Sequence, residues 1–176
     1  MKIIIGEIPD TGALDVEFFE KKEVLNSLFN KKLESDFHFD SPVKGSFHIS
    51  KEGKTIFVDL TLSGAVMVDC SRCLEVFEYP INEACQLTFS PHEKEKGEKE
   101  AELEEKDFER TYYDNCLDLD EILREETALR LPFNPTCKKD CKGLCSSCGK
   151  NLNEGNCSCT NKIIDRRLEI LTKLKT

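Results

Sequence analysis

The sequence predicts an α+β fold, in which a mainly antiparallel, partly barrel-like sheet carries a few short helices and a C-terminal cysteine-rich, zinc-ribbon-like module. Three observations lead to this prediction. Residues 56–70 alternate between apolar and polar side chains over a length that suits one long strand. A helix start signal stands at Asp118, and six of the ten cysteines fall between Cys137 and Cys159.

Residues 1–91 are predicted to form a mainly β body. The N-terminal part reads as two strands around a turn at 9–12, followed by a short helix over 24–29. Residues 51–54 have the composition of a hairpin turn before the long strand of 56–70. In that strand the even positions are apolar, which places Cys70 on the face that is expected to be buried.

Residues 92–110 are predicted to be an acidic mobile loop. From Glu93 to Asp107 the chain holds eight acidic residues and four lysines with almost nothing apolar, so burial offsets little of the ordering entropy. A solvated helix is the alternative structure. Attraction of a basic partner is a less favoured interpretation of the charge.

Residues 111–135 are predicted to contain a helix that completes the body. Asp118 is placed as its N-cap, with Glu121 three residues later, Leu129 on the apolar face, and Pro132 as the end. Glu126 and Arg130 are spaced as an i,i+4 ion pair, which we favour over a catalytic acid. Residues 162–176 are predicted to form a C-terminal amphipathic helix.

The distribution of charge along the chain indicates which kinds of partner are possible. The net charge of −9 argues against a nucleic-acid binder, but from Thr136 onward nine basic and four acidic side chains give +5, which leaves −14 for the rest. This positive charge can either offset metal-bound thiolates or contact RNA or another partner. The candidate contact residues are Lys138, Lys139, Lys142, Lys150, Arg166 and Arg167.

The compartment is expected to be the cytoplasm. The first residues contain no apolar run long enough for a signal peptide or a membrane span. Clustered cysteines in a reducing compartment are more often metal ligands than disulfides. Cys85 and Cys116 stand apart from the clusters, and we expect them to be buried apolar side chains.

The cysteine spacing predicts two structural zinc sites. Cys145-Ser-Ser-Cys148-Gly149 has the form of a zinc knuckle, in which glycine supplies a positive φ after the second cysteine. A tetrahedral site takes four thiolates. The six cysteines between Cys137 and Cys159 are two more than one site needs, and the upstream pair Cys70/Cys73 is two fewer. The predicted ligand sets are therefore Cys145, Cys148, Cys157 and Cys159 for a local site, and Cys70, Cys73, Cys137 and Cys141 for a bridging site.

Other thiol chemistry is less well supported. An iron–sulfur cluster also takes four thiolates, but the bacterial ferredoxin spacing is missing. A thioredoxin-like pair would lie at a strand–helix junction, whereas Cys70 ends an alternating strand. The sequence contains no glycine-rich phosphate loop, nucleophile elbow or His-Glu-x-x-His motif, so we expect a protein that is not an enzyme.

The order of these motifs resembles a known family. A Cys-x-Arg-Cys-Leu strand end lies at 70–74, and a Leu-Asp-Leu helix ending in Leu-Pro lies at 117–132. They are followed by Cys-Lys-x-x-Cys-Lys-Gly-Leu-Cys-x-x-Cys-Gly-x-Asn-Leu-Asn-x-Gly-x-Cys-x-Cys at 137–159, and by an Asp-x-Arg-Leu helix start at Asp165. This arrangement is similar to the YceD family, the large ribosomal RNA subunit accumulation proteins.

The resemblance implies a non-enzymatic ribosome-biogenesis factor that supports accumulation or processing of 23S ribosomal RNA. The expected partner is ribosomal RNA or a large-subunit assembly protein, with no small-molecule substrate and no membrane. Two alternatives remain open: a metal-stabilised protein-interaction module unrelated to RNA, and a thiol redox or metal-handling protein. The oligomeric state is also left open.

Overall fold

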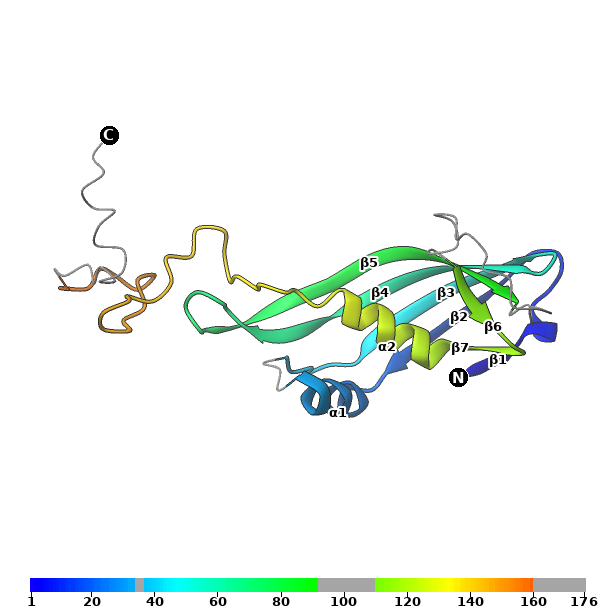
Figure 1. The fold of residues 1–176 in the computed structure, drawn as a ribbon, viewed down its shortest axis with the longest axis horizontal. Helices are drawn as coiled ribbons and strands as arrows, with labels where there is room; N and C mark the ends of the chain where they lie inside the picture. Colours follow the sequence, from blue (N-terminus) through cyan, green and yellow to red (C-terminus); the bar gives the residue numbers. More distant parts are fainter. Residues whose placement is uncertain (34–36, 92–109, 160–176) are drawn as a thin grey trace, which may run out of the picture. The chain divides into compact units, whose positions relative to one another are not determined.

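The fold is described for residues 1–33, 37–91 and 110–159 of a computed structural model (Figure 1). The chain divides into two units, each of which is taken by itself. The first unit comprises Met1–Met67 and Glu78–Pro132, and the second comprises Val68–Phe77 and Phe133–Thr176. The acidic loop expected over 92–110 lies outside the described residues except for Arg110, and so does the helix expected over 162–176.

A five-stranded sheet forms most of the first unit, with strand order β2-β3-β4-β5-β6. The strands are β2 (Ala13–Glu20), β3 (Val43–Glu52), β4 (Thr55–Asp69), β5 (Val76–Pro91) and β6 (Arg110–Tyr113). The β2–β3 and β3–β4 pairs are antiparallel, and β6 runs parallel to β5. Glu52 pairs with Thr55 across the β3–β4 hairpin, which confirms the predicted turn at 51–54.

The remaining elements are short. Strands β1 (Lys2–Ile4) and β7 (Cys116–Asp118) pair antiparallel in a separate two-stranded sheet, and a 3-10 turn, η1 (Ile5–Glu7), follows β1. Helix α1 (Lys22–Leu33) follows β2 and extends beyond the 24–29 expected from sequence. Helix α2 (Leu119–Leu129) packs on the sheet (Figure 1), where Arg124 Nε donates to Glu20 Oε2 at 2.6 Å.

The alternating pattern of the long strand correctly predicted its buried face. The even positions of β4 are essentially inaccessible to solvent: Ile56, Val58, Leu60 and Leu62 are each no more than 1% exposed. Phe47 of β3 and Ile81 of β5 join them in the core. Apolar burial of about 25 cal/mol per Å² makes this face the main source of stability of the first unit.

The expected partial barrel is wrong. Among the described strands, β2 and β6 form the two edges of the five-stranded sheet, and β1 and β7 pair only with each other, so the sheets stay open. Closure would require paired edges with a fixed stagger. Alternation along β4 reports only that one face of the strand is buried. An open sheet covered by helices satisfies that pattern equally well.

Helix α2 begins as predicted and ends earlier. The Asp118 side chain accepts from the backbone N–H of Glu121 at 3.4 Å, so Asp118 is the N-cap. The expected ion pair is present, with Arg130 Nη1 2.5 Å from Glu126 Oε2. Leu129, expected on the apolar face, is 75% exposed, because the helix stops at this residue. Within the described part of the chain, no helix has the length and apolarity to cross a bilayer.

Candidate metal centres

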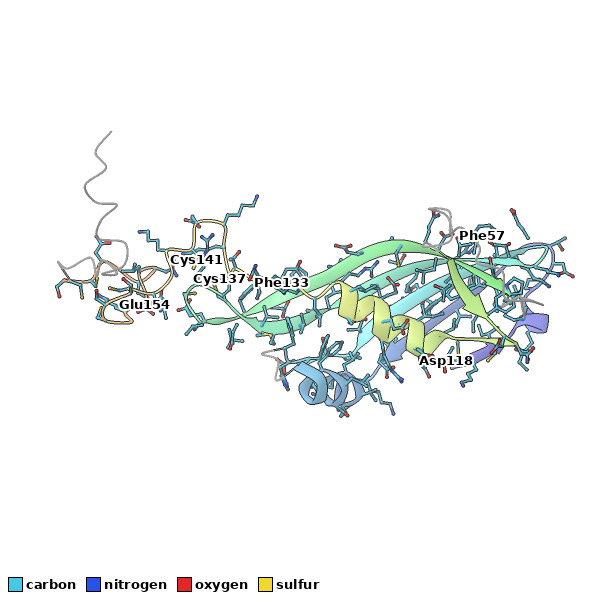
Figure 2. The ribbon with its side chains drawn as sticks, viewed as in Figure 1. Phe57, Asp118, Phe133, Cys137, Cys141 and Glu154 are labelled. Atoms are coloured by element: carbon cyan, nitrogen blue, oxygen red, sulfur yellow. The ribbon has the colours of Figure 1, made fainter. Side chains whose placement is uncertain are left out.

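Four cysteines of the second unit gather into a first cysteine group: Cys70, Cys73, Cys137 and Cys141. Cys70 and Cys73 lie in the turn between β4 and β5, and Cys137 and Cys141 lie on the irregular segment that follows Pro132 (Figure 2). Their sulfur atoms all lie within 4.8 Å of one another. Cys70, Cys73 and Cys141 are at most 5% exposed, and Phe77 and Leu144 pack against them.

The sulfur separations fit one tetrahedral ion. Cys70 Sγ lies 3.8 Å from Cys141 Sγ, and Cys73 Sγ lies 3.7 Å from Cys137 Sγ. A tetrahedron with zinc–sulfur bonds of about 2.3 Å has edges of about 3.8 Å. A disulfide would need about 2.05 Å, and all ten cysteines are free thiols. The donor set and its geometry can therefore accommodate a soft, tetrahedral ion.

Backbone hydrogen bonds hold the two segments of the first cysteine group together. The N–H of Ser71 donates to the carbonyl of Pro135 at 2.8 Å, and the N–H of Leu144 donates to the carbonyl of Arg72 at 3.1 Å. The Arg72 guanidinium also donates to the carbonyl of Cys141 at 3.1 Å. The cysteine pairs at 70–73 and 137–141 are thus aligned by contacts that do not involve the thiols.

Hydrogen-bond donors favour the thiolate form of two of these four cysteines, Cys70 and Cys141. Burial opposes ionisation of Cys70, but the backbone N–H groups of Cys137, Arg72 and Cys73 outweigh it and lower the pKa of Cys70 to about 6. The Cys137 N–H lies 3.4 Å from Cys70 Sγ. The amide of Asn153 donates to Cys141 Sγ at 3.3 Å and lowers the pKa of that thiol. Thiolates are the form that binds metal.

The second cysteine group contains Cys145, Cys148, Cys157 and Cys159, again with all sulfur atoms within 4.8 Å of one another. Cys145 Sγ lies 3.4 Å from Cys157 Sγ. The backbone N–H of Ser147, 3.4 Å from Cys145 Sγ, acts with that of Cys148 to lower the pKa of Cys145 to about 6. The Cys148 thiol, in contrast, raises the pKa of Cys159 to about 12. Four thiolates repel one another, and a bound cation would remove that repulsion.

The two groups differ in solvent access. Cys148 and Cys159 are exposed, whereas three cysteines of the first cysteine group are buried. The two sets of four are the sets expected from sequence. Cys85 and Cys116 belong to neither: Cys116 is exposed, contrary to expectation, and Cys85 is half-buried, with burial and the Glu126 carboxylate raising its pKa to about 11.

The basic candidates of the second unit lie on the segment that carries the cysteines. Lys138, Lys139, Lys142 and Lys150 are all exposed, and Lys150 Nζ donates to the carbonyl of Asn156 at 3.2 Å. Arg166 and Arg167 lie outside the described residues. These positions stay candidates for contact with RNA or another partner.

Two asparagines contribute to the first cysteine group in a way that the sequence did not indicate. Asn153 contacts Cys141 and also accepts from the Lys142 N–H at 2.9 Å. Asn151 donates to Glu75 at 2.8 Å and orients Asn153, whose amide donates to Asn151 Oδ1 at 2.9 Å. The sequence suggested only a turn here, because turns are also rich in asparagine. Their i,i+2 spacing inside the cysteine cluster is the signal that could have indicated this role.

The chain is similar in sequence to proteins of two bacteria and of a plant. YlbN of Bacillus subtilis, an uncharacterised protein, is 29% identical over 175 residues, covering 99% of this chain and 96% of YlbN. An uncharacterised protein of Mycobacterium leprae is 25% identical over 113 residues, covering 64% of this chain and 50% of its own. The chloroplastic large ribosomal RNA subunit accumulation protein YCED homolog 1 of Arabidopsis thaliana is 24% identical over 177 residues, covering 88% and 55%.

The chain thus spans about half the length of the mycobacterial and plant relatives and nearly all of the Bacillus one. No solved structure matches it. The sequence model of the family described as large ribosomal RNA subunit accumulation protein YceD matches residues 58–175, which include both cysteine groups. With about two thirds of its length matched by that model, the chain belongs to the YceD family.

Proposed function

We propose that this protein is a non-enzymatic ribosome-biogenesis factor that supports accumulation or processing of 23S ribosomal RNA and is stabilised by two structural zinc ions. Membership of the YceD family carries the proposal, because the family name and the name of the Arabidopsis relative both refer to accumulation of the large-subunit RNA. The chemistry of the two cysteine groups supports the absence of catalysis. Catalytic zinc keeps a position open for water or substrate, whereas here four thiols can fill every position of each tetrahedron.

Zinc fits better than the other metals considered. Four thiolates suit zinc and iron–sulfur clusters alike, but in each group all four sulfur atoms lie within 4.8 Å of one another, and some pairs are only 3.4 to 3.8 Å apart, which corresponds to four ligands around a single ion. The zinc ions would stabilise the second unit, whose described residues have few buried apolar side chains besides the first cysteine group. Structural zinc contributes about 10 kcal/mol or more to such small modules.

The partner that we favour is a protein of the large-subunit assembly process, with ribosomal RNA as the other candidate. The second unit has ten basic and six acidic side chains, a net of +4. Two zinc ions bound by eight thiolates would add about −4 in total. That leaves no excess positive charge, whereas phosphate-dominated binding needs a broad basic surface. A cytoplasmic location fits the ten free thiols.

The proposal is tested in a strain that lacks the gene. We expect the ratio of 23S to 16S ribosomal RNA to fall and to recover when the wild-type chain is supplied. An unchanged ratio contradicts the proposed function. Elemental analysis of the purified chain should give two zinc ions and no iron. Binding of purified chain to 23S fragments, titrated with salt, separates the two partners: tight binding that weakens steeply as salt rises favours RNA.

A further inference from the structure

The first cysteine group is shielded from solvent. Cys70, Cys73 and Cys141 are each at most 5% exposed. The side chains of Phe77 and Leu144 pack against the group and cover part of it. A reagent dissolved in water therefore reaches these sulfur atoms only when the second unit opens locally.

The second cysteine group is open to solvent at the turn Cys145–Gly149. Cys148 is exposed, and so are Ser146, Ser147 and Gly149 around it. A Cβ atom added to Gly149 would meet no described atom within 4 Å apart from its chain neighbours, so the space beside Cys148 is free. Cys159 of the same group is exposed as well. A small reagent can therefore reach two of these four sulfur atoms without any opening of the fold.

Exposure and ionisation together distinguish these two cysteines from the other exposed one. A bound zinc ion holds its cysteines as thiolates, which are the nucleophilic form of the side chain. Cys116 is exposed too but belongs to neither group. A free thiol of this kind, with a pKa of about 8.5, is only roughly 3% ionised at neutral pH. Oxidants attack exposed thiolates first, which singles out Cys148 and Cys159.

We propose that Cys148 is an oxidation site for hydrogen peroxide and related hydroperoxides, and that its oxidation produces a disulfide with Cys159. The Cys148 thiolate attacks one peroxide oxygen, the O–O bond breaks, and the departing hydroxide takes up a proton to give water, which leaves a sulfenic acid. The Cys159 thiolate then attacks that sulfur, the S–O bond breaks, and a second hydroxide is protonated to water. The two sulfur atoms lose two electrons in total, and the peroxide gains them.

The geometry of the second cysteine group permits this disulfide. All four sulfur atoms lie within 4.8 Å of one another, so Cys148 and Cys159 have to approach by at most about 2.8 Å to reach the S–S bond length. Cys145 and Cys157, whose sulfur atoms are 3.4 Å apart, then remain as the unoxidised pair. Two thiolates fill only half of a tetrahedral site, so the ion is released.

The first cysteine group keeps its structure when the second is oxidised. The hydrogen bonds of Ser71 to Pro135 and of Leu144 to Arg72 involve no residue beyond Leu144. Oxidation thus loosens residues 145–159 while the segments at 70–73 and 137–141 stay joined. Reduction of the disulfide by a cellular thiol reverses the change. This inference rests on the zinc ions of the proposed function and adds control by oxidation to it.

The test uses the full chain, reduced and loaded with zinc, and up to one equivalent of hydrogen peroxide. Released zinc is measured with a chromogenic chelator, and remaining thiols are alkylated and located by mass spectrometry. We expect loss of one zinc ion and of two of the ten thiols, with a Cys148–Cys159 crosslink as the main product. Cys116 and the first cysteine group should stay unmodified. Dithiothreitol and added zinc should restore the starting state.

Two histidine variants separate the reacting pair from its neighbours. Cys159→His keeps four zinc donors, because zinc also accepts imidazole, but lacks the second reacting thiol. It should retain zinc and accumulate a sulfenic acid at Cys148, detected with dimedone, in place of the crosslink. Cys157→His is the matched control and should still give the crosslink.

Three results would overturn the inference: release of both zinc ions together, oxidation of Cys116 before Cys148, or a main crosslink other than Cys148–Cys159. If a histidine variant binds too little zinc, the crosslink map of the wild-type chain still decides. A zinc content below two before oxidation contradicts the proposed zinc ions instead. In that case the order of thiol loss and the crosslink map decide the inference on their own.

Discussion

Substituting alanine for Gly143 and for Gly149 should destabilise the second unit to different extents. Both glycines have a φ of +71°, so alanine introduces about the same backbone strain at each, roughly 1 kcal/mol. They differ in their surroundings. A Cβ atom on Gly143 would lie 3.0 Å from the carbonyl oxygen of Arg72, whereas nothing lies within 4 Å of one on Gly149.

The contact at Gly143 cannot be relieved by a side-chain rotation, because the obstructing atom belongs to the backbone. The same oxygen accepts the 3.1 Å hydrogen bond from the N–H of Leu144. Moving this oxygen away would lengthen the hydrogen bond that holds the turn Cys70–Leu74 on the segment around Leu144. Such a lost hydrogen bond costs about 1 kcal/mol. We therefore expect Gly149→Ala to cost about 1 kcal/mol and Gly143→Ala about 2 to 3 kcal/mol.

Thermal unfolding of the zinc-loaded protein measures the difference. In a chain of this size, 1 kcal/mol corresponds to a change in Tm of about 2 to 4 °C. Gly143→Ala should thus lower Tm by at least twice as much as Gly149→Ala, with zinc content checked in both. Equal losses would show that the close approach of Gly143 to Arg72 adds nothing to the strain, and would refute the reasoning.

Three further predictions concern the metal sites and α2. Cys70→Ser and Cys148→Ser should each reduce the zinc content from two ions to one by elemental analysis. A chelator should remove zinc from the wild-type protein in two phases, and the faster phase should come from the second cysteine group because that group is more exposed. Cys148→Ser should therefore lack the faster phase. Asn153→Ala should weaken zinc affinity at the first cysteine group about 10-fold in a competition assay, because it removes the amide donor to Cys141, and unchanged affinity would exclude this role. Asp118→Ala should cost about 1 kcal/mol in urea unfolding, because the N-cap bond to Glu121 is lost, whereas Asp118→Asn should cost less.

Several features followed from the sequence because each depends on local chemistry. The buried face of β4 is set by a side-chain period of two, and the start of α2 is set by the oxygen of Asp118. The two groups of four cysteines could be predicted by counting. A site at Cys70 and Cys73 needs two more thiols, and Cys137 and Cys141 are the two that remain once four cysteines are assigned to the local site. Pairing of thiols by number and spacing required no knowledge of the sheet.

Features that depend on non-local geometry did not follow. Whether the sheet closes depends on whether the edge strands β2 and β6 pair with each other. The residues of these two strands do not specify which strand each will pair with. The parallel alignment of the four-residue β6 with β5 is equally invisible in the sequence. The exposure of Leu129 depends on where α2 ends, and helical periodicity does not specify the last turn.

The cysteine-rich segment is connected to the turn between β4 and β5, which is distant from it in the sequence. Four thiols, two backbone hydrogen bonds and the Arg72 guanidinium all connect residues 70–75 with residues 135–153. Most of these interactions converge on a single turn, Cys70–Leu74, which ends in the strained and exposed Leu74. Glycine would adopt the φ of +60° at this position without strain, as Gly149 adopts +71° in the turn Cys145–Gly149. The strain at Leu74 is tolerated because the surrounding cysteines and hydrogen bonds over-determine the turn, and an ion bound by the four thiols would fix it further.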